Sequence, residues 1–256
     1  FSQVVPDRIP AANEGGSTAP HIAGRDIHNK PFMVSGGLMG CWGGNESCDG
    51  MEGISNPAAN LGNTPIELLE SRQPIEITKY AFITNSGGPG SQRGGVALVR
   101  GYRLLEEAAE LVVRSDRRSV PPYGLGDGFP GTPSWNVIYS DGNQKLLPAC
   151  PMEAVPMKKG DEFVHYQAGA GGYGDPLNRD PKKVLRDTMN ELFSLDYAAE
   201  VYGVIIENEL VSNEETAKKR KILRADKSHK GAYMRHFHKA IGVDFSNWQP
   251  HFINKS

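Results

Sequence analysis

Glycine is concentrated in three short segments of this chain, residues 35–53, 86–95 and 168–174, and these segments constrain the fold more than any other feature. Glycine at such density indicates backbone with positive φ, or backbone pressed close against a neighbouring surface. A flexible linker would combine glycine with serine, whereas the first segment carries large side chains such as Trp42 and Met51. We therefore expect residues 35–53 to form an ordered, packed loop. That loop is either purely structural or lines an interface or a substrate tunnel.

The two later glycine segments invite a phosphate-binding interpretation, which their spacing does not support. Residues 86–95 contain no GxxxxGK[ST] and connect two predicted strands, so they lead to no helix N-terminus that could receive a phosphate. Residues 168–174 lack a GxGxxG followed by an amphipathic helix. Both segments are therefore expected to form tight turns. A serine hydrolase is also unsupported, because no GxSxG surrounds Ser35, Ser86 or Ser115.

Residues 75–164 show the pattern of β-strands. From Ile75 to Phe82 the residues alternate with the period of two that a strand requires. The apolar run at 135–139 is followed by Asp141-Gly142, a pair that tolerates the positive φ of a tight hairpin. A further strand is expected at 162–166. Residues 106–110 fit either a helical turn or a hairpin connection.

The two ends of the chain differ from this middle part. Prolines interrupt any helix in residues 1–62, because proline lacks the N–H and clashes with the preceding turn. Asp180-Pro181 supplies a helix N-cap followed by proline at the first position. Ser194 starts a second predicted helix, and Asn213 is a candidate cap for a third.

The predicted fold class is therefore α+β: a β-rich irregular domain of antiparallel strands and hairpins with a short helical C-terminal tail. We expect a Gly/Pro-rich loop region at 1–62, a β-rich domain at 63–178 and a helical segment at 179–256.

Composition excludes several classes of protein. The net charge of −2 gives no basic excess for nucleic acid or an acidic membrane surface. There is no apolar run long enough for a transmembrane helix. The three cysteines are too few for a secreted disulfide scaffold, which favours the cytoplasm. Cys41 and Cys48 could hold a metal, but zinc ribbons need paired CxxC motifs that are missing here, so free buried thiols are the alternative.

Histidines offer two further candidate sites. His21, Asp26 and His28 combine imidazole and carboxylate groups that suit Zn, Mn or Fe. Their spacing matches no established ligand frame, so surface or hydrogen-bonding roles remain open. His236 and His238 would share one side if extended, which is compatible with an interface, a surface or a catalytic role.

One stretch carries a more specific signal. Asn63-Thr64-Pro65-Ile66-Glu67-Leu68-Leu69-Glu70-Ser71-Arg72 is followed by a predicted strand and then by the glycine segment 86–95. A second stretch reads Gly171-Gly172-Tyr173-Gly174-Asp175-Pro176, with Tyr202-Gly203-Val204 further on. Together they resemble the B-subunit family of ATP-dependent hydantoinases, which includes halves of 5-oxoprolinases and the large subunits of ketone carboxylases. The resemblance spans roughly Val5 to Ile206 in the family's order and spacing.

The resemblance implies a function for a larger assembly. The chain would be the C-terminal part of a B subunit, beginning at Phe1 well inside the family pattern, with the N-terminal half and its metal ligands missing. An actin-like ATPase A subunit would use ATP and Mg to phosphorylate a carbonyl or amide oxygen, and the B subunit, with a divalent metal, would complete ring opening of a cyclic amide. The alternatives are a ketone carboxylase that uses bicarbonate, and a non-catalytic scaffold half. The chain alone is expected to have no turnover and to bind neither ATP nor a metal.

The same resemblance suggests site residues. Glu67, Glu70 and Arg72 are candidate catalytic residues, and Trp42, Asn63 and Arg93 are candidate substrate-binding residues. Glu67 and Glu70 lie three apart and would share one side of a helical turn. Paired carboxylates can perform acid–base work if burial or repulsion shifts a pKa. Glu70 could equally join Arg72 and Arg93 in a structural ion-pair network.

Overall fold

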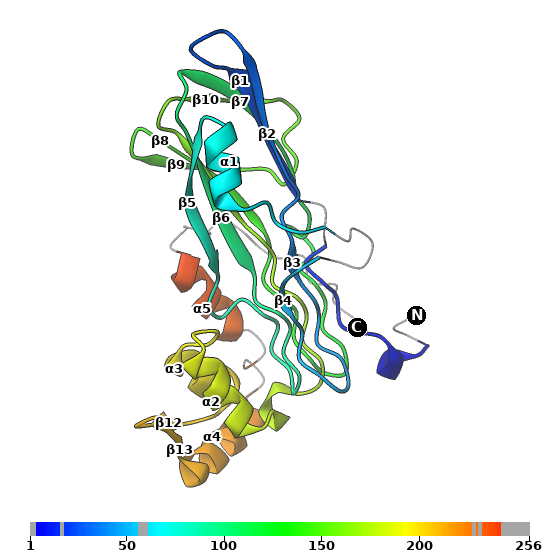
Figure 1. Ribbon diagram of the computed structural model, residues 1–256. Coiled ribbons are helices and arrows are strands. Elements are labelled where there is room, and N and C mark those ends of the chain that lie inside the picture. The colour runs from blue at the N-terminus through cyan, green and yellow to red at the C-terminus, as the bar shows by residue number, and fades with distance from the viewer. Residues whose placement is uncertain (1–3, 16–17, 56–60, 227–228, 230–231, 242–256) are drawn as a thin grey trace.

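The computed structural model describes residues 4–15, 18–55, 61–226, 229 and 232–241. Two antiparallel sheets form its upper part (Figure 1). The four-stranded sheet has the order β10 (Val155–Lys158), β7 (Ala108–Arg114), β1 (Ala19–Arg25), β2 (Pro31–Ser35). The five-stranded sheet has the order β5 (Ile75–Phe82), β6 (Leu98–Leu104), β11 (Glu162–Tyr166), β8 (Trp135–Ser140), β9 (Asn143–Leu147).

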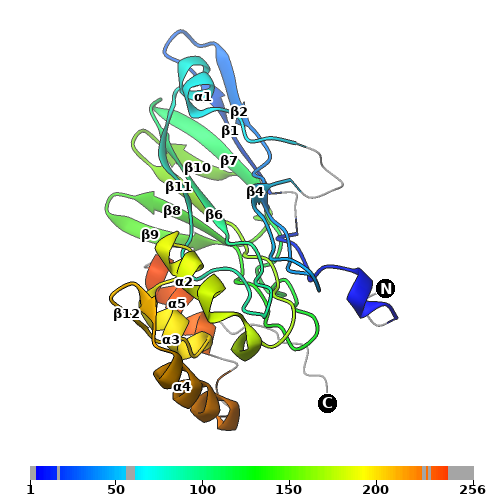
Figure 2. The same ribbon diagram turned by 60° about the horizontal axis from the view of Figure 1, so that its bottom comes forward.

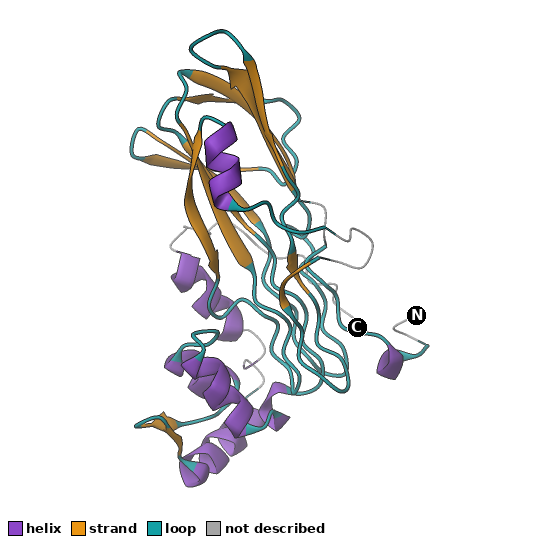
Figure 3. Cartoon of the chain, viewed as in Figure 1, coloured by secondary structure: helices purple, strands orange, loops and turns teal. Residues whose placement is uncertain are grey.

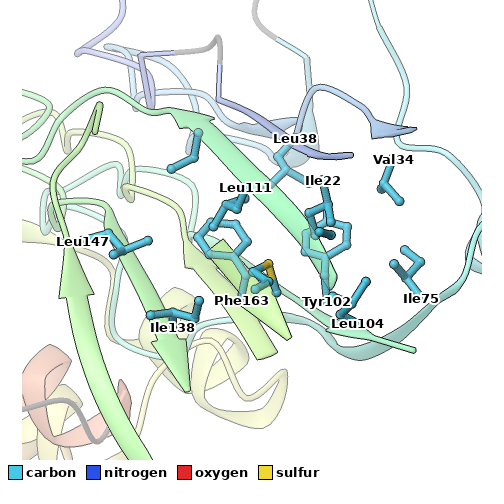
Figure 4. Close-up of a cluster of buried hydrophobic side chains, with 13 residues drawn as sticks. Ile22, Val34, Leu38, Ile75, Tyr102, Leu104, Leu111, Ile138, Leu147 and Phe163 are labelled. Atoms are coloured by element: carbon cyan, nitrogen blue, oxygen red, sulfur yellow. The ribbon is translucent and has the colours of Figure 1, made fainter. Parts of the chain in front are cut away.

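The two sheets pack face to face over one apolar core. Successive side chains of a strand point to opposite faces, and in β7 the buried residues Ala109, Leu111 and Val113 alternate with exposed ones. They meet Tyr102 and Phe163 of the other sheet (Figure 4). Burial at roughly 25 cal/mol per Å² of apolar surface makes this layer the main stabilising contact between the sheets.

The five-stranded sheet is also covered on its outer face. Trp135, Val137 and Val164 form a second cluster there with Phe237 of helix α5 (Ala232–Ile241). Strands buried on both faces lose the alternation of polar and apolar residues, and residues 135–138 of β8 are accordingly all buried.

Below the two large sheets most residues of the glycine segments run as extended loop chains that lie side by side, which we call the glycine bundle (Figure 3). Backbone hydrogen bonds join them: Gly44 N donates to Gly171 O (2.9 Å), Gly88 N to Ala170 O (2.7 Å) and Gly50 N to Arg93 O (2.7 Å). The prediction of a tight turn at 168–174 is therefore wrong, whereas residues 86–95 do reverse the chain, since Gly94 N donates to Gly88 O at 2.9 Å. A Cβ added at Gly169 would lie 1.9 Å from Ser86 O, so the glycines are needed because neighbouring backbones approach closely.

The described residues from 176 onwards are mainly helical and lie at one end of the molecule, away from α1 (Ile66–Arg72) (Figure 2). They contain α2 (Pro181–Met189), α3 (Leu195–Val201), α4 (Asn213–Ala225) and α5. Asp180 caps α2 by accepting from Lys182 N, and Ser194 caps α3 by accepting from Tyr197 N, as predicted. For α4 the N-cap position is Ser212, one residue before the predicted Asn213. The short hairpin of β12 (Ile206–Glu207) and β13 (Leu210–Val211) was not predicted.

The α+β, strand-rich fold class is confirmed, whereas the loop-rich interpretation of residues 1–62 is incomplete. That region supplies β1 and β2 to the sandwich, the short pair β3 (Gly40–Cys41) and β4 (Glu52–Ile54), and the 3₁₀ turn η1 (Pro6–Arg8). Proline excludes a helix but is tolerated at the first residue of an edge strand, where Pro31 lies. Residues 106–110 form neither a helical turn nor a hairpin: Ala108 begins β7, and the residues before it carry the chain from β6 in the five-stranded sheet to β7 in the four-stranded sheet. The division into three domains stays a prediction.

The remaining regular element is the 3₁₀ turn η2 (Pro176–Asn178), which Asp175 caps by accepting from Leu177 N. In the part of the chain that the structure describes, no helix has the length and apolar character needed to cross a membrane.

Candidate functional site

The predicted catalytic residues lie on α1, a seven-residue helix without a buried residue. Glu67, Glu70 and Arg72 are all exposed there. Glu70 has a structural contact, because its Oε1 accepts a hydrogen bond from Ile77 N of strand β5 at 2.7 Å. Glu67 has no such contact among the described residues. The two carboxylates therefore differ: Glu70 anchors the helix to the sheet edge, and Glu67 faces solvent.

The residues just before α1 are fixed to the sandwich. Asn63 Oδ1 accepts from Met39 N at 3.1 Å, and Arg100 Nη2 donates to Thr64 O at 3.1 Å. The buried guanidinium of Arg100 lies 4.8 Å from the centroid of the Tyr80 ring, a cation–π distance. These hydrogen bonds fix the position of residues 63–65 relative to the sheets, and α1 begins directly after them.

Arg93 lies elsewhere, in a nearly buried network of charges at the glycine bundle. It pairs with Glu52, and its Nε lies 3.4 Å from Asp187 Oδ2. Arg179 binds Asp49 through two parallel contacts of 2.6 and 2.9 Å and reaches Asp187 at 2.5 Å. The predicted network of Glu70, Arg72 and Arg93 is wrong: among the described residues, the ion pairs of Arg93 are with Glu52 and Asp187.

The charges of this network stabilise one another. Burial by itself would raise the pKa of Asp49, but the hydrogen bond and charge of Arg179, together with Arg93, hold that pKa below its ordinary value. Burial would likewise lower the pKa of Arg93, and the charges of Asp187 and Glu52 raise it instead. Asp49 and Arg93 therefore stay ionised. The network links the loop after β3 to helix α2. We call its five members the clasp: Asp49, Glu52, Arg93, Arg179 and Asp187.

The six predicted site residues do not form one constellation. Trp42 is partly buried and donates from Nε1 to Ser55 O at 2.8 Å. Within the described ranges, no hydrogen bond or ion pair joins any two of Glu67, Glu70, Arg72, Trp42, Asn63 and Arg93. Asn63 and α1 are neighbours in the chain, whereas Arg93 belongs to the clasp.

Sequence reasoning missed a buried polar group inside the sandwich. His165 is fully buried, and its Nδ1 lies 2.7 Å from Asn136 Oδ1. The Asn136 amide donates to Ser115 Oγ at 2.9 Å, so its Oδ1 accepts and His165 Nδ1 carries the proton. Burial, helped by the charge of Arg118, lowers the pKa of His165 from 6.5 to about 3. The available signal was the position of His165 two residues after Phe163, on the same face of a predicted strand.

Neutral His165 predicts a pH dependence of stability. Because its pKa is about 3 in the folded protein and 6.5 ordinarily, its contribution is complete above pH 6.5 and is lost as the pH falls towards 3. The loss approaches about 1.4 kcal/mol per pH unit. Urea unfolding at pH 7, 6 and 5 should show a steeper decline for the wild type than for His165→Gln. Equal slopes would mean that His165 does not contribute in this way.

The described residues offer no ligand set for a metal ion: they contain no group of three or more His, Cys, Asp or Glu side chains placed to hold one. Asp26 instead closes the β1–β2 turn by accepting from His28 N (2.9 Å) and Lys30 N (2.8 Å). All three cysteines are free. Cys41 is buried, as the free-thiol alternative predicted, whereas Cys48 and Cys150 are exposed.

Of the two predicted C-terminal candidates, His236 and His238, the structure describes only the side chain of His236. His236 Nε2 lies 2.9 Å from Glu200 Oε2, a contact between α5 and α3. The side chain of His238 lies outside the described residues.

Three glycine N–H groups of residues 86–95 that could bind a phosphate are already hydrogen-bonded to backbone carbonyls. Gly88 N, Gly94 N and Gly95 N donate to Ala170 O, Gly88 O and Trp42 O at 2.7–2.9 Å. A nucleotide phosphate would find these donors already used. The geometry thus supports a rigid platform that holds an exposed motif helix, and it does not provide a nucleotide site at these segments.

Comparison with known proteins identifies the family of this chain. The family model described as hydantoinase B/oxoprolinase matches residues 1–176. The chain belongs to the hydantoinase B/oxoprolinase family. It is 30% identical over 225 residues to the B subunit of a putative D-/L-hydantoinase from Pseudomonas sp. (strain NS671), and the match covers 87% of this chain and 37% of that protein.

Two solved structures share the fold of this chain. The ATP-dependent caprolactamase from Pseudomonas jessenii matches with a TM-score of 0.75 and 26% identity, covering 86% of this chain and 40% of that one. A nucleotide-free acetone carboxylase matches with a TM-score of 0.77 and 16% identity, covering 98% and 43%. The latter likeness shows the fold alone. The chain thus spans about two fifths of the length of these proteins.

Proposed function

We propose that this chain is the C-terminal part of the B subunit of an ATP-dependent cyclic-amide hydrolase of the hydantoinase or oxoprolinase type. The observation that carries the proposal is the match to the ATP-dependent caprolactamase over 86% of the chain. An amide carbonyl is a poor electrophile, and phosphorylation of its oxygen makes ring opening feasible. The ATP-binding A subunit and the N-terminal half of the B subunit are the proposed partners. ATP, Mg and a divalent metal would belong to the whole complex, which we place in the cytoplasm.

This chain would act in that complex as a support for the motif segment. The hydrogen bonds at Asn63 and Thr64 and the contact of Glu70 with Ile77 fix α1 while its outer side stays exposed. We propose that Glu67 and Arg72 face the reacting groups and that Glu70 and Asn63 position them. Trp42 is retained as a substrate-binding candidate. For Arg93, burial in the clasp favours a structural role over substrate contact.

ADP release tests the reaction class. The complex, isolated with its natural partners, should release ADP when given a hydantoin or a lactam without bicarbonate, and the 256-residue chain alone should not. Release that requires both a ketone and bicarbonate would establish the carboxylase alternative instead. A complex that turns over equally well after this chain is removed would make the chain a scaffold.

Substitutions of Glu67 and Glu70 test the site. In the assembled complex Glu67→Gln is expected to lower kcat by about 10²- to 10⁴-fold if Glu67 performs general acid–base catalysis. Glu70→Ala should instead lower stability by about 1 kcal/mol, because it removes the acceptor of Ile77 N.

Glu76→Gln is the matched control, an exposed glutamate that pairs with Arg103 on the neighbouring strand. It should leave both readouts unchanged. Unaltered kcat in a well-folded Glu67→Gln complex would assign Glu67 to the surface.

A further inference from the structure

A pocket of about 470 Å³ opens at the turn that follows β7, on the side of the molecule where β9 also ends. It is lined by Gly15, Ser115, Asp116, Arg117, Arg118, Ser119, Val120 and Ala149. None of the residues predicted for the catalytic or substrate-binding site belongs to this lining. The pocket therefore requires its own explanation.

Arg117 has a backbone conformation that its side chain disfavours. Its φ is 63°, in the left-handed region where residues other than glycine are uncommon. The carbonyl of Arg117 accepts from Ser134 N at 3.3 Å, which helps to hold this conformation. Gly15 makes room for the side chain, because a Cβ at residue 15 would lie 2.9 Å from Arg117 Cγ. Strained residues of this kind concentrate at functional sites.

The guanidinium of Arg117 also has an unused donor. Its Nε is buried and has no hydrogen-bond partner among the described residues. The neighbouring Arg118 is already engaged: it donates to Ser134 O (2.7 Å) and Leu147 O (3.2 Å), and its guanidinium lies 4.4 Å from the Trp135 ring centroid. The Arg117 side chain lines the pocket, and no hydrogen bond or ion pair of its guanidinium is found in the described ranges, so an anion bound there would supply a missing partner.

We propose that this pocket binds a small oxyanion, a phosphate or a carboxylate group, through the guanidinium of Arg117. The planar guanidinium presents parallel N–H donors that match the spacing of phosphate and carboxylate oxygens. Ser119 adds an exposed hydroxyl at the rim. Glu14, the buried acid near Arg117, is engaged by Cys41 N at 3.3 Å. The inference is independent of the proposed reaction, since it involves no residue of α1.

Asp116 provides a second test, in which the expected change in anion affinity has the opposite direction. Its carboxylate lines the same pocket and no ion pair with it is found in the described ranges, while its backbone carbonyl accepts from Ser134 Oγ. A negative side chain beside a bound anion weakens binding by repulsion. Removing that charge should therefore strengthen binding, whereas removing the charge of Arg117 should weaken it.

The experiment is a calorimetric titration of the full chain with inorganic phosphate and, separately, with acetate. Arg117→Gly should weaken binding by at least about tenfold with an unchanged or higher Tm, because glycine relieves the positive φ. Asp116→Asn should tighten binding several-fold. Arg114→Gln, an exposed charge change on β7 outside the pocket lining, should have little effect.

The two ligands distinguish the source of the oxyanion. Saturable binding of phosphate alone supports a phosphate site, and binding of both ligands supports a site that also accepts carboxylates. The proposal is overturned if neither ligand binds saturably, or if Arg117→Gly binds as well as the wild type.

Discussion

Arg179→Met is expected to lower the free energy of unfolding by about 3–5 kcal/mol, the cost typical of breaking a buried ion pair from one side. The Arg179 side chain is fully buried and neutralises Asp49 and Asp187, which lie 2.5–2.9 Å from its guanidinium. Methionine fills a similar volume but leaves two carboxylates with too few partners. Because the clasp joins the loop after β3 to α2, the loss should also loosen the helical end of the molecule.

Urea unfolding of the full chain, followed by circular dichroism, measures this effect. Arg103→Gln is the matched control, because Arg103 pairs with Glu76 at 2.8 Å on the surface, with 41% of its side chain exposed. An exposed pair of this kind contributes at most about 1 kcal/mol. Equal losses for the two variants would show that the clasp is no more important than a surface pair.

Gly169→Ala is the second substitution with a large expected effect. The new Cβ would lie 1.9 Å from Ser86 O and 2.6 Å from Ser86 C, both backbone atoms that cannot rotate away. The segments of the bundle must then separate, and their shared hydrogen bonds lengthen. We expect a loss of about 3 kcal/mol or more, at the upper end of overpacking effects.

Gly62→Ala provides the comparison at a glycine with open space, since no neighbouring atom of the described residues lies within 4 Å of the added Cβ. Its stability should be unchanged or slightly higher, because alanine reduces the entropy of the unfolded chain. Thermal unfolding of both variants separates the two cases. A Gly169→Ala protein with the Tm of Gly62→Ala would contradict the close packing of the bundle.

Features governed by neighbouring residues in the chain could be predicted from the sequence. Asp141-Gly142 forms the expected hairpin turn with φ of 50° and 76°. Asp180 and Ser194 cap their helices as predicted. The motif at 63–72 led to the correct family, because its residue types and spacing are specific. In each case the signal and the structure involve residues only a few positions apart.

The candidate site was harder to predict because its geometry depends on distant segments. The sequence predicts the turn that contains Glu67 and Glu70, but not that Glu70 accepts from the edge of β5. Arg93 looked like a neighbour of the motif, and the fold instead places it with Glu52, 41 positions away. Buried charges choose partners by three-dimensional proximity, and one sequence alone does not report that proximity.

The sequence by itself determined the strand-rich class, the helical tail, several turns and caps, and the family. Only the tertiary structure decided what the glycines do, since the carbonyls that exclude a Cβ at Gly169 or Gly131 come from other segments. It also decided the partners of Arg179 and Asp49, which are 130 positions apart in the chain. Local propensity acts over a few residues, whereas close packing and charge pairing depend on which segments the fold brings together.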